Sequence, residues 1–276
     1  MKSGWIKKRF DEVADFPPKI KLKKGEKYPF IPMENLDGGV KFAKPLIKKE
    51  LTGGGAKFEE GDTLFARITP CLENGKIAQA KDLEGNPGFG STEYFVFRGK
   101  KGISDTDFIY YLSKTRWFQQ SAINSMVGGS GRQRADARFV KSLEINLPPL
   151  PTQRKIAAIL SAYDDLIENN LKRIKLLEEK AQLTYEEWFV RMKFPWHETT
   201  PIDKETGLPE GWDIVKVGDL LAKVKTTKKI KSSEILDTGD TPVIDQSRDF
   251  IKGYTNEAEA LILIDEPIIV FGDHTR

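Results

Sequence analysis

The stretch "LPPLPTQRKIAAILSAYDDLIENNLKRIKLLEEKAQLTYEEW", residues 147–188, sets the architecture of this chain of 276 residues. Three prolines within residues 148–151 keep the chain before Thr152 extended, because proline cannot continue a helix and restrains the residue before it. We expect Thr152 to cap the helix that follows. No Gly or Pro occurs from there to Met192, which predicts one helix of roughly 60 Å.

Apolar or core-compatible residues recur along this helix at alternating spacings of four and three. Such a heptad seam, widened by Leu166, Leu171 and Tyr185, predicts pairing with a partner helix. Asn170 within the seam either fixes the register of the pairing or occupies a slightly exposed position, and the sequence leaves both readings open. The seam consists of Ile156, Leu160, Tyr163, Ile167, Asn170, Ile174, Leu177, Ala181, Thr184 and Trp188.

The charges on the helix are balanced, with seven basic and seven acidic residues between positions 152 and 192. A helix that binds DNA would carry an excess of basic residues. The pattern therefore favours a solvated face beside a protein–protein seam.

The chain before Pro148 has short β-like runs, "TLFARI" at 63–68 and "EYFVFR" at 93–98, separated by Gly, Pro and Asn. Residues 107–124 have the pattern of one amphipathic helix with Asp107 as its N-cap. Because the predicted strands come first in the chain and the helix comes late, we expect an α+β domain, followed by the long coiled-coil helix.

A second copy of the first domain begins after the helix. "GWIKKRFDEVADF" from Gly4 resembles "GWDIVKVGDLLAKV" from Gly211, and the same offset of 207 residues aligns "GDTLFARIT", from Gly61, near "EPIIVFGDHTR", from Glu266. The matching then stops, so the copy is incomplete. The expected divisions are a first domain (1–150), the long helix (151–193), a linker (194–210) and the incomplete second domain (211–276).

Composition excludes several classes of protein. Hydrophobic residues make up 39% and charged residues 31%, which is typical of a soluble globular chain, and no apolar run reaches the roughly 18 residues of a membrane span. The N-terminus has no apolar segment of a signal peptide, so we expect the cytoplasm. One cysteine, Cys71, excludes an intrachain disulfide, and with two distant histidines, His197 and His274, it builds no zinc site. We expect no metal, no cofactor and no catalytic residue.

A glycine- and arginine-rich stretch, "MVGGSGRQRADARF" at 126–139, resembles a phosphate-binding loop but lacks the Gly-Lys-Ser/Thr of a P-loop. Arg134 stands where the third glycine of G-x-G-x-x-G would be. "NLPPL" lacks the aromatic residue of an amino-methyltransferase motif, and the spacing in "PCLENGK" does not fit a nuclease metal site, so "NGK" is interpreted as a hairpin turn.

Two interpretations of the Gly-Arg loop remain open: a loop with solvated arginines, and a DNA contact in which arginines bind phosphates or guanines. A net charge of +3 does not choose between them. The candidate DNA-binding residues, of which the group is a better hypothesis than any member, are Arg132, Arg134 and Arg138, then Arg67, Lys76 and Arg98.

The order of these features resembles the specificity (S) subunit of type I restriction–modification enzymes. The resemblance rests mainly on "LPPLPTQRKIAAIL…LIENNLKRIKLLEEKAQLTYEEWF", with "GLPEGW" opening the second copy, and covers essentially the whole chain. It implies target recognition domains at 1–150 and, incomplete, at 211–276, with residues 151–193 as a helical spacer between two DNA half-sites. It also implies a non-catalytic subunit that directs methyltransferase (M) and restriction (R) subunits to a bipartite site in double-stranded DNA.

The incomplete second half departs from the family pattern. It leaves the seam without its second helix, and we expect two copies to pair their helices antiparallel as a homodimer. The rival interpretations are a coiled-coil assembly protein without DNA contact and a fragment of a fused methyltransferase.

Overall fold

The computed structural model describes residues 4–129, 132–222, 224, 227–245, 250–263, 268 and 270. The chain forms two compact units, Met1–Met192 and Lys193–Arg276. This boundary lies within one residue of the expected end of the long helix.

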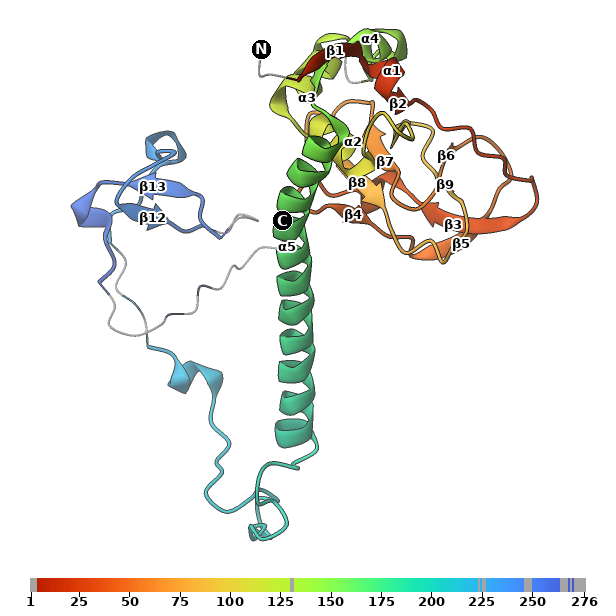
Figure 1. Cartoon of the computed structure of the whole chain (residues 1–276). Helices are drawn as coiled ribbons and strands as arrows, with labels where there is room; N and C mark the ends of the chain where they lie inside the picture. Colours follow the sequence, from red (N-terminus) through yellow and green to blue (C-terminus); the bar gives the residue numbers. More distant parts are fainter. Residues whose placement is uncertain are drawn as a thin grey trace. The chain divides into compact units, whose positions relative to one another are not determined.

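The first unit contains three sheets (Figure 1). A five-stranded sheet has the order β2-β10-β7-β8-β4, a four-stranded sheet has the order β5-β3-β9-β6, and β1 pairs antiparallel with β11. The β-like runs of the sequence at 63–68 and 93–98 are confirmed as the neighbours β7 and β10. The strands are β1 (Ile6–Arg9), β2 (Ala14–Asp15), β3 (Lys27–Ile31), β4 (Phe42–Ala43), β5 (Ile47–Glu50), β6 (Ala56–Phe58), β7 (Thr63–Ala66), β8 (Ile77–Ala80), β9 (Gly88–Gly90), β10 (Tyr94–Gly99) and β11 (Glu144–Leu147).

Five α-helices accompany these sheets in the first unit: α1 (Phe10–Val13), α2 (Thr106–Ser113), α3 (Arg116–Asn124), α4 (Ala137–Ser142) and α5 (Leu150–Tyr185). A 3₁₀ turn, η1 (Met33–Asn35), follows β3. The α+β class expected from the sequence is confirmed.

The expectation of one helix across residues 107–124 was wrong. The chain breaks at Lys114 and forms α2 and α3, because Thr115 takes an extended conformation and its hydroxyl accepts from the amide of Phe118, capping a new helix. The N-cap of α2 is Asp105, whose carboxylate accepts from the amide of Phe108. Asp107 instead pairs with Lys41.

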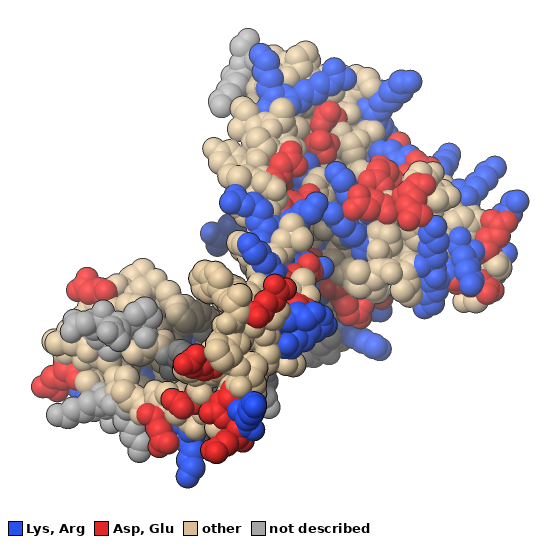
Figure 2. Space-filling view, turned by 90° about the horizontal axis from the view of Figure 1, so that it is seen from below, with Lys and Arg blue, Asp and Glu red and all other residues tan. Residues whose placement is uncertain are grey.

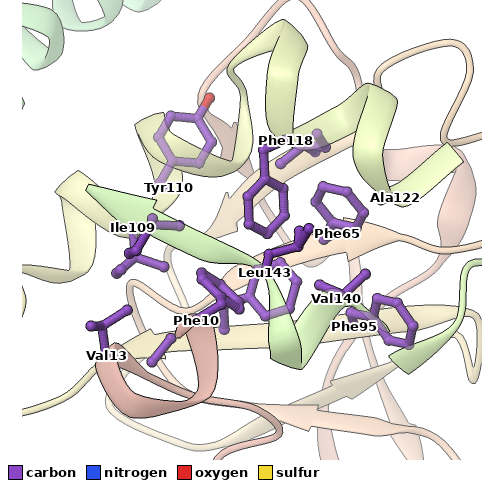
Figure 3. Close-up of a cluster of buried hydrophobic side chains, with 14 of the residues drawn as sticks. Phe10, Val13, Phe65, Phe95, Ile109, Tyr110, Phe118, Ala122, Val140 and Leu143 are labelled. Atoms are coloured by element: carbon purple, nitrogen blue, oxygen red, sulfur yellow. The ribbon is translucent and has the colours of Figure 1, made fainter. Parts of the chain in front are cut away.

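Both faces of the five-stranded sheet are buried. Because side chains alternate along a strand, Phe95 and Phe97 of β10 contribute to one core while Tyr94 and Val96 contribute to a second. The first core packs the sheet against the helices, and the ring of Phe10 lies against that of Phe118 (Figure 3). The ring of Phe10 also contacts that of Phe97. The second core lies between the two larger sheets. This layering holds the connecting loops in defined positions.

The long helix α5 begins earlier than expected. Its N-cap is Pro149 without a side-chain cap, and Leu150 and Pro151 form the first turn, where proline has no amide hydrogen to lose. Thr152 therefore lies inside the helix, not at its cap. The helix ends in a π turn, η2 (Glu186–Val190), after which Met192 has a φ of +56°.

The "NGK" stretch lies in the connection between antiparallel neighbours β7 and β8, as a hairpin requires. The connection spans residues 67–76 and is folded into turns, with the amide of Asn74 donating to the carbonyl of Pro70. It is longer than the tight hairpin expected from the sequence.

The second unit contains short elements: η3 (Val217–Leu220), η4 (Ser232–Glu234), β12 (Thr241–Val243), β13 (Gly253–Thr255) and η5 (Ala258–Ala260). Of its described residues only Pro209 and Thr255 are buried. The described part of this unit therefore has no buried hydrophobic cluster.

The start of the proposed internal repeat has matching local structure in both units. Gly4 and Gly211 have φ angles of +87° and +83°, and the short helices α1 and η3 follow them at the common offset of 207 residues. A left-handed backbone favours glycine, which accounts for glycine at both positions. The second alignment of the repeat, with residues 266–276, and His274 fall almost wholly outside the described residues.

Candidate nucleic-acid interface

The Gly-Arg loop (residues 126–139) links α3 to α4 and is closed at its base. Val127 and Arg134 exchange two backbone hydrogen bonds of 3.0 Å. Gly128 has a φ of +132°, and a Cβ there would lie 2.9 Å from the carbonyl oxygen of Arg132, so the loop requires glycine at this point. The carboxylate of Asp136 caps α4, accepting from the amides of Arg138 and Phe139. Ser130 and Gly131 lie outside the described residues.

The loop docks on the chain that leaves β7. The amide of Thr69 donates to the carbonyl of Gln133 (3.0 Å), and the amide of Gln133 donates to Oγ1 of Thr69 (3.1 Å). The amide of Ala135 donates to the carbonyl of Arg67 (2.8 Å). These bonds bring Arg67 beside the loop although 65 sequence positions or more separate it from the loop arginines.

The carboxylate of Glu93 is bonded to one predicted arginine, Arg134, and is influenced by the charges of two more, Arg67 and Arg132. Arg134 pairs with it at 2.6 Å through Nη2 and also donates from Nε. This bonding lowers the pKa of Glu93, and the charges of Arg67 and Arg132 lower it further. We call Arg67, Glu93, Arg132 and Arg134 the arginine cluster. The arginine cluster thus has three positive charges and one negative charge.

Arg67 and Arg132 are the members of the arginine cluster that have donors to offer. The Arg132 side chain is exposed. The Arg67 guanidinium lies 4.7 Å above the ring of Phe95, and its buried Nε has no hydrogen-bond partner among the described residues. A buried donor without a partner is costly. The Arg67 side chain as a whole is half-buried, so part of it is accessible to solvent.

The other three predicted residues are not brought to this cluster by any hydrogen bond or ion pair of the described residues. Arg138 is exposed at the start of α4. Lys76 donates to the carbonyl of Met33 (3.2 Å). Arg98 makes a two-pronged bond to Asp62 (2.6 and 2.7 Å) and a third contact with Glu59.

The bonds of Arg98 give it a structural role. Asp62 is 1% exposed, and burial raises the pKa of its carboxyl while the bonds from Arg98 oppose that shift. All three guanidinium nitrogens of Arg98 contact a carboxylate, and we therefore leave it out of the proposed interface. Nothing in the local sequence indicated this partner, because Asp62 is 36 positions away.

Sequence reasoning missed a second basic surface. Residues 17–50 hold nine lysines against four acidic residues. Lys19, Lys21 and Lys24 are exposed, and none of them forms an ion pair within the described part of the chain. Figure 2 shows basic side chains gathered on the side of this unit that carries β3 and β5, with acidic side chains among them. We call residues 19–27 the lysine run. Its signal in the sequence was the alternation of lysine with Ile20 and Leu22, which are half-buried.

The helix seam remains uncovered in the first unit. Only Ile156, near the helix start, packs against the core. Tyr163 is 66% and Leu177 63% exposed, and every residue from 169 to 183 is exposed. The remaining large seam residues, Leu160, Ile167, Ile174 and Trp188, are also exposed, as are Leu176 and Leu183 beside them.

No helix in the described part of the chain is both long and apolar enough to cross a membrane. No group of three or more His, Cys, Asp or Glu in that part of the chain is arranged to hold a metal ion.

Comparison with known proteins identifies a family. Residues 2–179 match the family described as type I restriction modification DNA specificity domain. The chain is 31% identical over 185 residues to the type I restriction enzyme MjaIX specificity subunit of Methanocaldococcus jannaschii, and 31% identical over 179 residues to the EcoAI specificity subunit of Escherichia coli. These matches cover 64% and 61% of this chain but 39% and 30% of the relatives. The chain thus spans about a third of their length.

The fold is also shared. The crystal structure of a type I restriction–modification S subunit from M. genitalium aligns with a TM-score of 0.54 at 18% identity. The alignment covers 92% of this chain and 62% of that one.

Proposed function

Because this chain belongs to the type I restriction modification DNA specificity family, we propose that its first unit is a DNA-recognition domain that binds a double-stranded half-site. The observation that carries this proposal is the arginine cluster, where Arg134 is bonded to the carboxylate of Glu93 and backbone hydrogen bonds hold Arg67 beside the Gly-Arg loop. Duplex DNA presents phosphates and guanine edges, which are the groups that arginine binds most specifically.

The members of the arginine cluster have different roles in this proposal. Glu93 holds Arg134 in place, so Arg134 supports the loop and adds positive charge. Arg132 and Arg67 direct their donors to the DNA. The lysine run adds contacts to the phosphate backbone, which strengthen binding without reading sequence. Arg138 and Lys76 remain candidates for such backbone contacts.

The partners follow from the family. We propose that the chain is a non-catalytic subunit that carries methyltransferase (M) and restriction (R) subunits to a bipartite DNA site. The exposed seam of α5 supports this, because an apolar helix face of that length requires a protein partner. Residues 211–276 belong, in this proposal, to a second recognition domain.

The experiment measures DNA affinity of the chain assembled with its methyltransferase subunits, across a salt titration. Arg132→Ala and Arg67→Ala are each expected to weaken binding of the target DNA sequence by roughly 5- to 100-fold. Lys175→Ala, on the exposed part of α5, is the matched control and should leave affinity unchanged. Equal affinities for all four proteins at every salt concentration would reject the arginine cluster as the interface.

The two rival functions predict other outcomes. A coiled-coil assembly protein would give a complex whose DNA affinity is the same with and without this chain. A methyltransferase fragment would transfer methyl groups to DNA when purified alone, and we expect no transfer from the isolated chain.

A further inference from the structure

The face of α5 that contacts the recognition domain changes from apolar to polar along its length. Near the helix start, Ile156 and Ala157 join the hydrophobic core. Further along, the residues that touch the domain are Ser161, Asp164 and Glu168, spaced at three and four so that they lie on one face. This face differs from the seam, whose residues follow a separate series of positions.

Lys41 is the centre of this polar contact. Its side chain is only 4% exposed, although burial of a charged group is costly unless the group is paired. Its Nζ donates to Oγ of Ser161 (2.8 Å) on α5 and lies 3.3 Å from the carboxylate of Asp107 on α2. The rings of Tyr111 and Phe42 lie 5.1 and 5.3 Å from the same ammonium. One lysine thus joins the strand side of the domain to both helices.

Two further contacts continue the same line. The hydroxyl of Tyr111 donates to Asp164 (2.5 Å) and lies 3.1 Å from Oγ of Ser161. One turn on, Lys44 pairs with Glu168 at 2.6 Å. We call Lys41, Tyr111, Ser161 and Asp164 the polar brace, which Lys44 extends.

A separate anchor holds the start of the helix. The buried amide side chain of Gln153 accepts from the amide of Asp105 (2.9 Å) and donates to the carbonyls of Ile103 and Pro148 (3.1 and 2.8 Å). An anchor at one point leaves a helix free to tilt. A second contact, roughly 12 Å or more along the axis, fixes its direction.

We propose that the polar brace is a positioning device that sets the angle between the recognition domain and α5. Directional hydrogen bonds suit this purpose because they are satisfied in one arrangement, whereas an apolar contact tolerates sliding. Because α5 is long, a small change of angle has a large effect at its far end. A tilt of about 10° at Gln153 would move that end by roughly 9 Å, nearly three base-pair steps of DNA. The consequence for the spacing of the two DNA half-sites rests on the proposed function. The angle between the recognition domain and α5 does not depend on it.

The brace is suited to mutation because its removal leaves little buried charge behind. The carboxylate of Asp107 is 48% exposed, so Lys41→Met, which keeps the length of the side chain, does not strand a buried anion. Ser161→Ala and Tyr111→Phe test the brace from the other two elements. Lys172→Met, on the exposed part of α5, is the matched control.

The experiment measures the angle through distances between spin labels in the full chain. Labels at Thr52→Cys and Glu178→Cys, in a Cys71→Ser background, join the domain to the distal helix. A second pair at Thr52→Cys and Lys101→Cys reports on the domain alone. We expect Lys41→Met and Ser161→Ala to broaden or shift the first distance by roughly 5 Å or more, because Glu178 lies about 37 Å from Gln153 along the axis. The second distance and the Lys172→Met control should be unchanged.

Several outcomes would overturn the proposal. An unchanged first distance in both brace variants would show that the Gln153 anchor alone sets the angle. Changes in both distances would show that the brace only stabilises the domain. If Lys41→Met fails to fold, the distances in Ser161→Ala and Tyr111→Phe test the proposal instead, because each of these variants removes hydrogen bonds and no charge.

In the assembled methyltransferase, the same variants should methylate targets whose half-site spacing differs by one or two base pairs from that of the unmodified protein. If a variant changes the angle between the domain and α5 but methylates targets with the same half-site spacing, the angle does not determine that spacing. The angle measurement needs no DNA, so it stands whether or not the chain binds DNA.

Discussion

Arg134 donates to the carboxylate of Glu93 through both Nε and Nη2, with a shortest distance of 2.6 Å. This ion pair fastens the Gly-Arg loop to the residue that precedes β10. The loop is thereby attached to the most buried sheet of the domain. The stability of the Gly-Arg loop should therefore depend on the charge of Glu93.

The first prediction concerns pH. Because Arg134 lowers the pKa of Glu93 in the folded state, the pair stabilises the loop above the ordinary glutamate value of 4.5, and this contribution is lost as pH falls through the lowered pKa. A carboxyl NMR titration should give Glu93 a midpoint below 4.5, with the Arg134 Nε–H signal lost over the same range. Arg134→Met should raise that midpoint. An equal midpoint in both proteins would mean that the ion pair does not form in solution.

The second prediction concerns Arg98. Its replacement by Ala leaves the carboxylate of Asp62 buried without its cation, and we expect a loss of about 2–3 kcal/mol in the free energy of unfolding. Lys7→Ala breaks the exposed pair with Glu144 and should cost under about 0.5 kcal/mol. Denaturant unfolding measures both. Similar losses for the two variants would contradict the structural role of Arg98.

The third prediction concerns the helix seam. If two copies pair through α5, Leu177→Glu places a charge in the interface and should shift the chain from dimer to monomer at micromolar concentration. The domain should keep its unfolding midpoint, because Leu177 is 63% exposed within one chain. Sedimentation analysis distinguishes the states, with Lys172→Glu as the control. A monomeric unmodified chain at that concentration would count against the homodimer.

The fourth prediction concerns the lysine run. Replacing Lys19, Lys21 and Lys24 by Gln should reduce the dependence of DNA affinity on salt in the assembled complex, lowering the slope of log K against log salt by roughly 2 to 3. Preference for the target over other sequences should persist, since phosphate contacts carry no sequence information. A triple Gln variant at Lys172, Lys175 and Lys180 on α5 is the matched control. Equal slopes in both triple variants would remove the lysine run from the interface.

Periodic features of the fold could be predicted from the sequence, whereas partners distant in sequence could not. The length of α5 followed from the absence of Gly and Pro, and its exposed seam followed from the heptad spacing. Its N-cap was misplaced by three residues, at Thr152 instead of Pro149, because both a threonine cap and a proline in the first turn are typical of helix beginnings. Asp107 and Asp105 are equally suitable caps by residue type, and only the tertiary pairing of Asp107 with Lys41 separates them.

The candidate interface was predictable in part for the same reason. Arg132 and Arg134 stood out because they follow a group of three glycines, and the structure adds Arg67 to them through the bond from Ala135. Glu93, which organises the cluster, carries no local signal. Arg98 was also among the candidates, and its engagement by Asp62 depends on the pairing of strands far apart in the chain.

The exposed part of α5, residues 169–183, has a consequence for the resistance of the chain to proteases. A single helix without tertiary contacts is marginally stable in water, so in the lone chain this part must open and close rapidly. Proteases cleave opened segments, and a partner helix that covers the seam closes them. We therefore expect a partner helix that covers the seam to protect residues 169–183 from proteolysis.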